Sequence, residues 1–111
     1  MRCNGENMES MEQFQIVVRE IQSARQQIAG LKAQILELEA TAEAIKNQPK
    51  DLALHQQLGG VLIEVSDRKS LHEVLLKDVE SLKEHMTRFE TREKELVSSY
   101  EELKKVLEGS Q

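Results

Sequence analysis

Side chains that could bind a metal ion are few in this sequence and lie far apart along it. The candidates are its three histidines, His55, His72 and His85, because neutral imidazole is a common metal ligand. No cysteine and no pair of carboxylates accompanies any of them at the spacing of known zinc sites. We therefore predict no metal site and interpret the three histidines as structural or surface residues.

The sequence also lacks the patterns that support nucleophilic catalysis or phosphate binding. Cys3 lies near the N-terminus and has no histidine or other general base beside it. Gly59-Gly60 lacks the GxxxxGK[ST] pattern of a phosphate loop, and Ser98-Ser99 lacks the G-x-S-x-G pattern of a nucleophilic serine. We expect no catalytic residue, no cofactor and no enzymatic activity.

The composition favours long helices over a compact globule. The chain has 111 residues, which suits one domain, and 32% of them are charged whereas only 3% are aromatic. It therefore has little of the aromatic bulk that usually fills a globular core. Its apolar residues are nevertheless periodic, unlike those of a disordered segment, so the composition is typical of a coiled coil.

Several classes of protein are excluded or disfavoured. A single cysteine cannot form an internal disulfide, so we expect a reducing compartment. The sequence contains no run of about 18 apolar residues, the length that a membrane-spanning helix needs. Residues 1–10 lack the apolar stretch of a signal peptide. The net charge is −5, from 15 Lys plus Arg against 20 Asp plus Glu, which argues against nucleic acid or an anionic membrane as a partner.

Proline and glycine divide the chain into two long helices and a short middle. Pro49 is the one proline, and Gly59-Gly60 is the other strong break in helical structure. The predicted organisation is a flexible tail over residues 1–7, a first coiled-coil helix over 8–48, a linker and β-hairpin over 49–66, a second coiled-coil helix over 67–108 and a tail over 109–111. Ser66 or Asp67 is expected to cap the second helix.

Each predicted helix carries one apolar stripe with alternating spacings of three and four residues, which is the a/d pattern of a coiled coil. We call these stripes the seams. The first seam consists of Phe14, Val17, Ile21, Ala24, Ile28, Leu31, Ile35, Leu38, Ala42 and Ile45. The second consists of His72, Leu75, Val79, Leu82, Met86, Phe89, Glu93, Leu96, Tyr100, Leu103 and Leu107, with His72 and Glu93 as polar interruptions.

The two seams match as an antiparallel pair when facing residue numbers sum to 117. Ile21 then faces Leu96, and each a position meets a d position. Glu93 falls opposite the small Ala24, where it is expected to fix the register or to reach solvent near Arg25. The midpoint of this register lies next to Gly59-Gly60, so the sequence predicts a hairpin of two helices, each about 60 Å long.

The middle segment is predicted to be a β-hairpin. Gly-Gly between two short runs is a hairpin signal, because both glycines can adopt positive φ. The second run, Val61–Val65, is almost wholly apolar, and a lone two-stranded hairpin is marginal in water. Either other subunits cover it, which we favour, or it folds back onto its own helices.

Helix, β-hairpin and helix in a chain of this length resemble a β-class subunit of the prefoldin family. The motif that carries the resemblance is Leu58-Gly59-Gly60-Val61-Leu62-Ile63-Glu64-Val65, which is similar to the family hairpin, where a Gly-containing turn leads into a Val-Leu-Ile/Val strand. A single hairpin indicates the β class, because α-class subunits have two. The coiled coils match the family only generically.

The resemblance implies a fold that is mostly α, with a long antiparallel two-helix coiled coil joined by a short β-hairpin. It also implies a subunit of a hetero-hexameric, ATP-independent cytoplasmic chaperone, which captures unfolded polypeptides and delivers them to a group II chaperonin. Its partners would be α- and β-class prefoldin subunits. The expected oligomerisation residues are Leu58, Gly59, Gly60, Val61, Leu62, Ile63 and Val65.

Client binding is expected where both helices end far from the hairpin, as the resemblance implies. The candidate residues there are Met8, Met11, Phe14, Leu103, Val106 and Leu107. Methionine is flexible and polarisable, which suits a surface that accepts unrelated apolar segments. Two other functions stay open: a structural coiled-coil adaptor or tether without chaperone activity, and a tubulin-binding or similar folding cofactor built as a helical hairpin.

Overall fold

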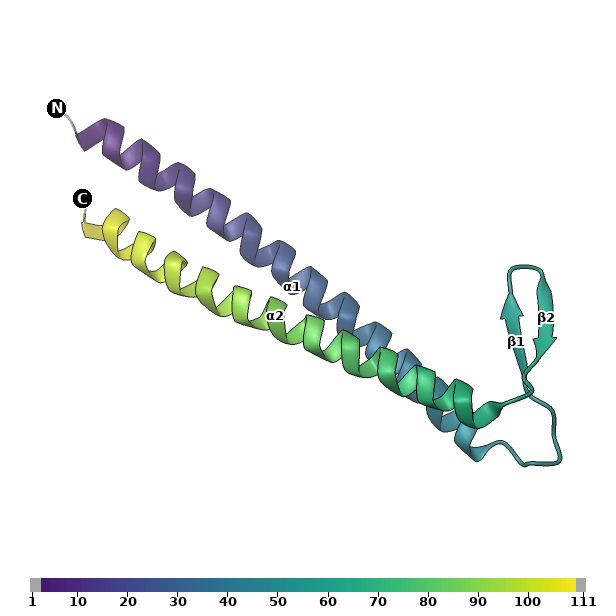
Figure 1. The fold of residues 1–111 in the computed structure, drawn as a ribbon. Helices are drawn as coiled ribbons and strands as arrows, with labels where there is room; N and C mark the ends of the chain where they lie inside the picture. Colours follow the sequence, from purple (N-terminus) through teal and green to yellow (C-terminus); the bar gives the residue numbers. More distant parts are fainter. Residues whose placement is uncertain (1–2, 110–111) are drawn as a thin grey trace. The chain divides into compact units, whose positions relative to one another are not determined.

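The computed structural model describes the backbone of residues 3–109 and the side chains of residues 8–109. Two long helices, α1 (Cys3–Asn47) and α2 (Arg68–Gly109), are connected through two short strands, β1 (His55–Leu58) and β2 (Val61–Glu64) (Figure 1). This confirms the predicted fold class of two long helices with a short β-hairpin between them. Among the described residues, no helix has both the length and the apolar content for a membrane span.

The first helix starts earlier than the sequence analysis placed it. Residues 3–7, which were predicted to belong to a flexible tail, are part of α1, and Gly109 is the last residue of α2 rather than the first of a tail. The stretch before Met8 contains no proline, and one internal glycine costs a helix only about 1 kcal/mol relative to alanine. Residues 1, 2, 110 and 111, and the side chain of Cys3, lie outside the described part of the structure.

Pro49 marks the end of α1. The Gln48 amide still donates to the Ala44 carbonyl at 3.0 Å, but the helix ends at Asn47 because proline disfavours the helical conformation of the residue before it. The chain then turns, and the Leu52 amide donates to the Pro49 carbonyl at 3.1 Å. The turn separates α1 from β1.

Asp67 caps α2. Its carboxylate accepts a hydrogen bond from the Ser70 amide at 3.0 Å, and its carbonyl accepts one from the Leu71 amide at 3.2 Å. These contacts satisfy amide groups that have no partner in the first turn of a helix. The structure thus selects Asp67 over Ser66 as the capping residue.

Arg68 links the start of α2 to the turn that follows α1. Its guanidinium donates to three backbone carbonyls, those of Gln48 at 2.7 Å, Leu52 at 2.8 Å and Pro49 at 3.4 Å. The planar guanidinium can serve several acceptors at once, which a lysine ammonium does less well. One side chain therefore holds together both ends of the segment that carries the hairpin.

Replacing Arg68 with alanine is expected to loosen the turn without unfolding the helices. Hydrogen bonds to a charged donor are worth about 1.5–3 kcal/mol each when buried, and less at this half-buried site. Hydrogen exchange at the Leu52 amide should therefore accelerate about tenfold, which corresponds to about 1.4 kcal/mol. The neighbouring exposed Lys69→Ala serves as control, and equal exchange in the two variants would contradict the role of Arg68.

The hairpin has the tight register that its sequence predicts. His55 pairs with Glu64, Gln56 with Ile63, Gln57 with Leu62, and Leu58 with Val61, so Gly59 and Gly60 form a two-residue connection. Gly59 has a φ of 62° and is the one described glycine in the left-handed region. A positive φ at the first central residue is typical of a type II′ turn, whose twist matches the flanking strands.

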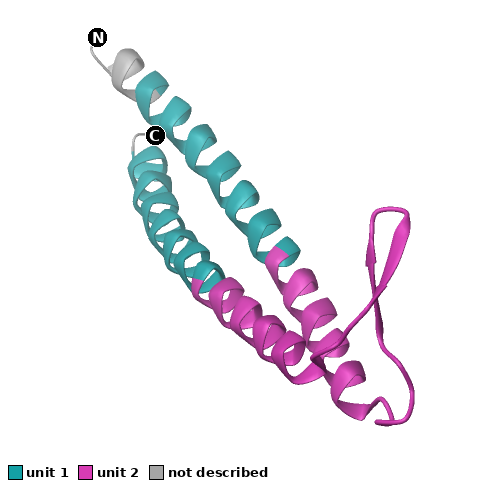
Figure 2. Cartoon of the chain, turned by 45° about the vertical axis from the view of Figure 1, so that its right-hand side comes forward, with its two compact units in different colours: residues 1–30, 85–111 teal, residues 31–84 magenta. Residues whose placement is uncertain are grey.

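The helices pack in two compact units (Figure 2). Residues 1–30 and 85–111 form the first unit, whose core contains Ile21, Ala24 and Leu96. This cluster agrees with the predicted pairing of Ile21 and Leu96. Residues 31–84 form the second unit, whose buried side chains also belong to the predicted seams: Leu31, Ile35, Ala42, Ile45 and Val79.

Candidate functional site

The hairpin presents one apolar and one mainly polar face. Because side chains alternate along a strand, the register places Gln56, Leu58, Val61 and Ile63 on one face. The opposite face carries His55, Gln57, Leu62 and Glu64. The Val65 amide donates to the Leu54 carbonyl at 2.8 Å, which brings these two apolar residues together below the strands.

The predicted oligomerisation residues of the two strands are open to solvent. Leu58, Val61, Leu62 and Ile63 are all about half to two-thirds exposed, whereas Val65 at the base is half-buried. The hairpin therefore does not fold back onto the helices of its own unit, which was the alternative left open by the sequence. A two-stranded sheet with an exposed apolar face and two unpaired edges is marginal alone and is a template for pairing with another chain.

Further apolar side chains of the second unit are exposed near the hairpin in sequence. Leu52 precedes β1, and Val74 and Leu76 lie in the first turns of α2. They fall outside the heptad seams, so the seam pattern did not single them out. These three side chains add to the exposed apolar area of this unit.

The first unit contains a groove of about 420 Å³, which we call the Ile16 groove. Its lining consists of Gln13, Ile16 and Val17 from α1 and Ser99, Glu102, Leu103 and Val106 from α2. Leu103 and Val106 were predicted to bind clients, and the groove brings them together with Ile16. Sequence reasoning missed Ile16 because it lies off the seam. In the structure its side chain is 45% exposed.

The other predicted client-binding residues do not line this groove. Phe14 stacks against Tyr100 with 4.9 Å between ring centroids and an interplanar angle of 32°. Met8 and Met11 are exposed, and Leu107 is half-buried. The structure therefore places two of the six predicted residues in the groove, one in an aromatic pair with Tyr100, two as exposed methionines on α1, and Leu107 as a half-buried side chain of α2.

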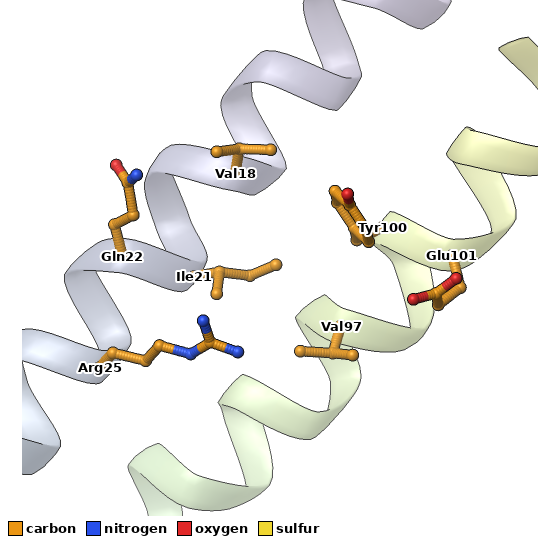
Figure 3. A pocket seen from close by; sticks show the side chains of 7 residues that line it. All are labelled: Val18, Ile21, Gln22, Arg25, Val97, Tyr100 and Glu101. Carbon is orange, nitrogen blue, oxygen red and sulfur yellow. The ribbon is translucent and has the colours of Figure 1, made fainter.

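A second groove, of about 340 Å³, lies between the helices of the first unit (Figure 3). Ile21 and Arg25 from α1 reach toward Val97 and Tyr100 from α2, and Val18, Gln22 and Glu101 complete the lining. The Arg25 guanidinium donates to the Glu93 carboxylate at 2.6 Å. Glu93 thus interrupts the seam by reaching Arg25, as the sequence suggested, and the pair contributes at most about 1 kcal/mol because Arg25 is solvent-exposed.

The histidines serve different local roles. His55 is exposed on the hairpin, His72 is half-buried on the α2 seam, and His85 meets the Phe89 ring edge-on, with 5.2 Å between centroids. In the described part of the chain, no three His, Cys, Asp or Glu side chains are grouped so that they could hold a metal ion. The notable surfaces of this protein are therefore apolar and lie on the hairpin and in the grooves of the first unit.

Comparison with known proteins accounts for this combination of helices and hairpin. A family model described as prefoldin subunit matches residues 8–111. The chain belongs to the prefoldin subunit family. The prefoldin β subunit from Thermococcus strain KS-1 has a similar fold, with a TM-score of 0.84 and 17% sequence identity over 95% of this chain and 91% of that one. No curated protein matches the chain in sequence.

Membership explains the resemblance carried by Leu58–Val65 and makes this chain a prefoldin subunit. The family is one of non-enzymatic chaperones, and a subunit of it is expected to assemble with other prefoldin subunits. The hairpin of this prefoldin subunit leaves the apolar side chains of its two strands exposed to solvent.

Proposed function

We propose that this prefoldin subunit assembles with α- and β-class subunits into a hetero-hexamer in the cytoplasm. The complex captures unfolded polypeptides without ATP and delivers them to a group II chaperonin. The observation that carries the assembly is the exposed apolar face of the hairpin, with Leu58, Val61 and Ile63 aligned on it. A coiled-coil tether does not require an exposed apolar sheet between its helices, so the hairpin argues against the adaptor alternative.

Assembly through the hairpin has a direct physical basis. Strand edges of other subunits can satisfy the unpaired amides and carbonyls of β1 and β2, and their side chains can cover the apolar face. Gly59 and Gly60 form the two-residue turn. Leu62 adds an apolar side chain on the opposite face of the hairpin, and Val65 adds one at its base. All seven predicted oligomerisation residues thus belong to the proposed interface or its turn.

The proposed client surface is the Ile16 groove, together with the exposed methionines and half-buried Phe14 and Leu107 of the same unit. The groove accepts apolar side chains on Ile16, Val17 and Leu103, and several such weak sites in one assembly would act together. This surface needs no bound nucleotide or metal to hold an apolar segment.

Mixing this chain with a purified α-class prefoldin subunit tests the assembly. Native mass spectrometry should show a hexamer with two α-class subunits, whereas a tether would give homodimers or no complex. The mixture, without ATP, should suppress aggregation of a chemically denatured model protein as it is diluted from denaturant. A stable hexamer that fails to suppress aggregation would contradict the chaperone role and leave the assembly in place.

Substituting Ile16 with asparagine tests the client surface. We expect several-fold weaker suppression of aggregation, because a polar side chain removes apolar area from the groove, worth about 25 cal/mol per Å². Leu36→Asn is the matched control, since Leu36 is 67% exposed and belongs to the other unit. Equal loss in both variants would place the binding surface outside the groove.

A further inference from the structure

One polar side chain, that of Gln56, lies within the apolar face of the hairpin. The hydrogen bond from the Val65 amide to the Leu54 carbonyl, at 2.8 Å, continues the strand register by one pair. Because side chains alternate along a strand, this pair lies on the same face as Gln56. The face then consists of Leu54, Gln56, Leu58, Val61, Ile63 and Val65, and Gln56 is its one polar member.

The two neighbouring glutamines of β1 use their side-chain amides differently. Gln57, on the opposite face, donates to the Gly59 carbonyl at 3.4 Å. Within residues 8–109, no group forms a hydrogen bond with the side-chain amide of Gln56. Gln56 is exposed in the isolated chain, so water can serve its amide until another subunit covers the face.

Covering the apolar face would change the surroundings of this amide. A glutamine side chain offers two N–H donors and one carbonyl acceptor. Against a wholly apolar surface these groups would lose water and gain no partner, which opposes association. A surface that presents a hydrogen-bonding side chain avoids this loss. A single buried asparagine selects partners in apolar coiled-coil interfaces by the same mechanism.

We propose that Gln56 determines which prefoldin subunit covers the apolar face. The subunit that it selects differs in sequence from this chain and presents an asparagine, glutamine, serine or threonine against the Gln56 amide. This inference rests on the proposed assembly through the hairpin and names the residue that makes it specific. Leu58, Val61 and Ile63 supply apolar contact area to any partner, whereas Gln56 distinguishes between partners.

The composition of the face disfavours a second copy of this chain as the occupant. A second copy that docks through the same face offers one polar side chain, its own Gln56, among five apolar ones. The two glutamines can meet only in one alignment of the two faces, and in every other alignment each amide lies against apolar groups. A subunit of different sequence is free of this restriction.

Gln56→Met provides a test in which two explanations predict opposite signs. Methionine has nearly the same length as glutamine and no amide, so it makes the face wholly apolar. If apolar area alone drives assembly, the variant should assemble more tightly with a purified α-class subunit. If Gln56 is hydrogen-bonded to that subunit, the polar group of the partner loses its own partner. The concentration at which half of the hexamer dissociates should then rise about tenfold, as measured by native mass spectrometry over a dilution series.

Two further variants locate the effect. Gln57→Met makes the same replacement on the opposite face and should leave the dissociation midpoint within about twofold of that of the unaltered chain. Gln56→Asn keeps an amide on a shorter side chain and should lose less than Gln56→Met. Hydrogen exchange at the Val65 amide, which bonds to Leu54, verifies that the hairpin forms in each variant.

The outcomes separate this inference from the assembly on which it rests. A Gln56→Met hexamer as stable as the unaltered one, or more stable, would overturn selection by Gln56 and leave the assembly in place. An equal loss with Gln57→Met would overturn the assignment to the apolar face. Homo-oligomers of the isolated chain that Gln56→Met dissociates would overturn a partner of different sequence. Failure of the unaltered chain to assemble with the α-class subunit would overturn the proposed assembly itself.

Discussion

Ile63→Lys is expected to abolish assembly with α-class subunits while the helices stay folded. Ile63 lies on the apolar face of the hairpin beside Val61 and opposite Gln56, and is 48% exposed in the isolated chain. Covering this face with another subunit would bury the lysine without a partner, at a cost of several kcal/mol. Native mass spectrometry should show separate subunits, and circular dichroism should show unchanged helix content.

Gln57→Lys provides the control within the same hairpin. Gln57 lies on the opposite face, where it pairs with Leu62 and has His55 and Glu64 as neighbours on the strands. The same charge introduced there should weaken assembly far less. Because both variants add one lysine, a difference in assembly between them reports which face of the hairpin contacts the other subunits. An intact hexamer with Ile63→Lys would refute assembly through the apolar face.

The heptad pattern was informative about the helices because it reports burial directly. Ile21 and Leu96 were paired from spacing alone and occur in one core cluster, and Glu93 was placed opposite Ala24 and reaches the adjacent Arg25. The glycine pair was similarly informative, since the two-residue connection between Leu58 and Val61 follows from turn geometry. Local patterns with a strong steric or apolar cause were therefore sufficient for these features.

The features that the sequence did not reveal depend on contacts between distant residues. Arg68 looks like an ordinary charged residue in the first turn of a helix, yet its guanidinium reaches carbonyls 16 to 20 positions away. Ile16 lies off the seam, and only its position beside Leu103 and Val106 gives it a place in a groove. The start of α1 at Cys3 was missed because no sequence signal distinguishes a tail from a helix end there.

The core of the first unit is small, which makes each of its buried side chains important. Leu96 is 5% exposed and is the one α2 residue in the buried cluster with Ile21 and Ala24. Val17, Val97 and Tyr100 pack against this cluster but are only half-buried. Because Ala24 contributes little volume, Ile21 and Leu96 are the two large side chains buried in this cluster.

Leu96→Ala is accordingly expected to lower the free energy of unfolding of the isolated chain by about 2–5 kcal/mol, the range for buried leucine truncations that leave a cavity. Thermal and urea unfolding at one fixed protein concentration would measure the change, because assembly shifts apparent stability. Leu36→Ala, which truncates a leucine that is 67% exposed, should change it by no more than about 0.5 kcal/mol. Similar losses from the two truncations would mean that Leu96 does not form the core contact described for the first unit, and the pairing of Ile21 with Leu96 would then be wrong.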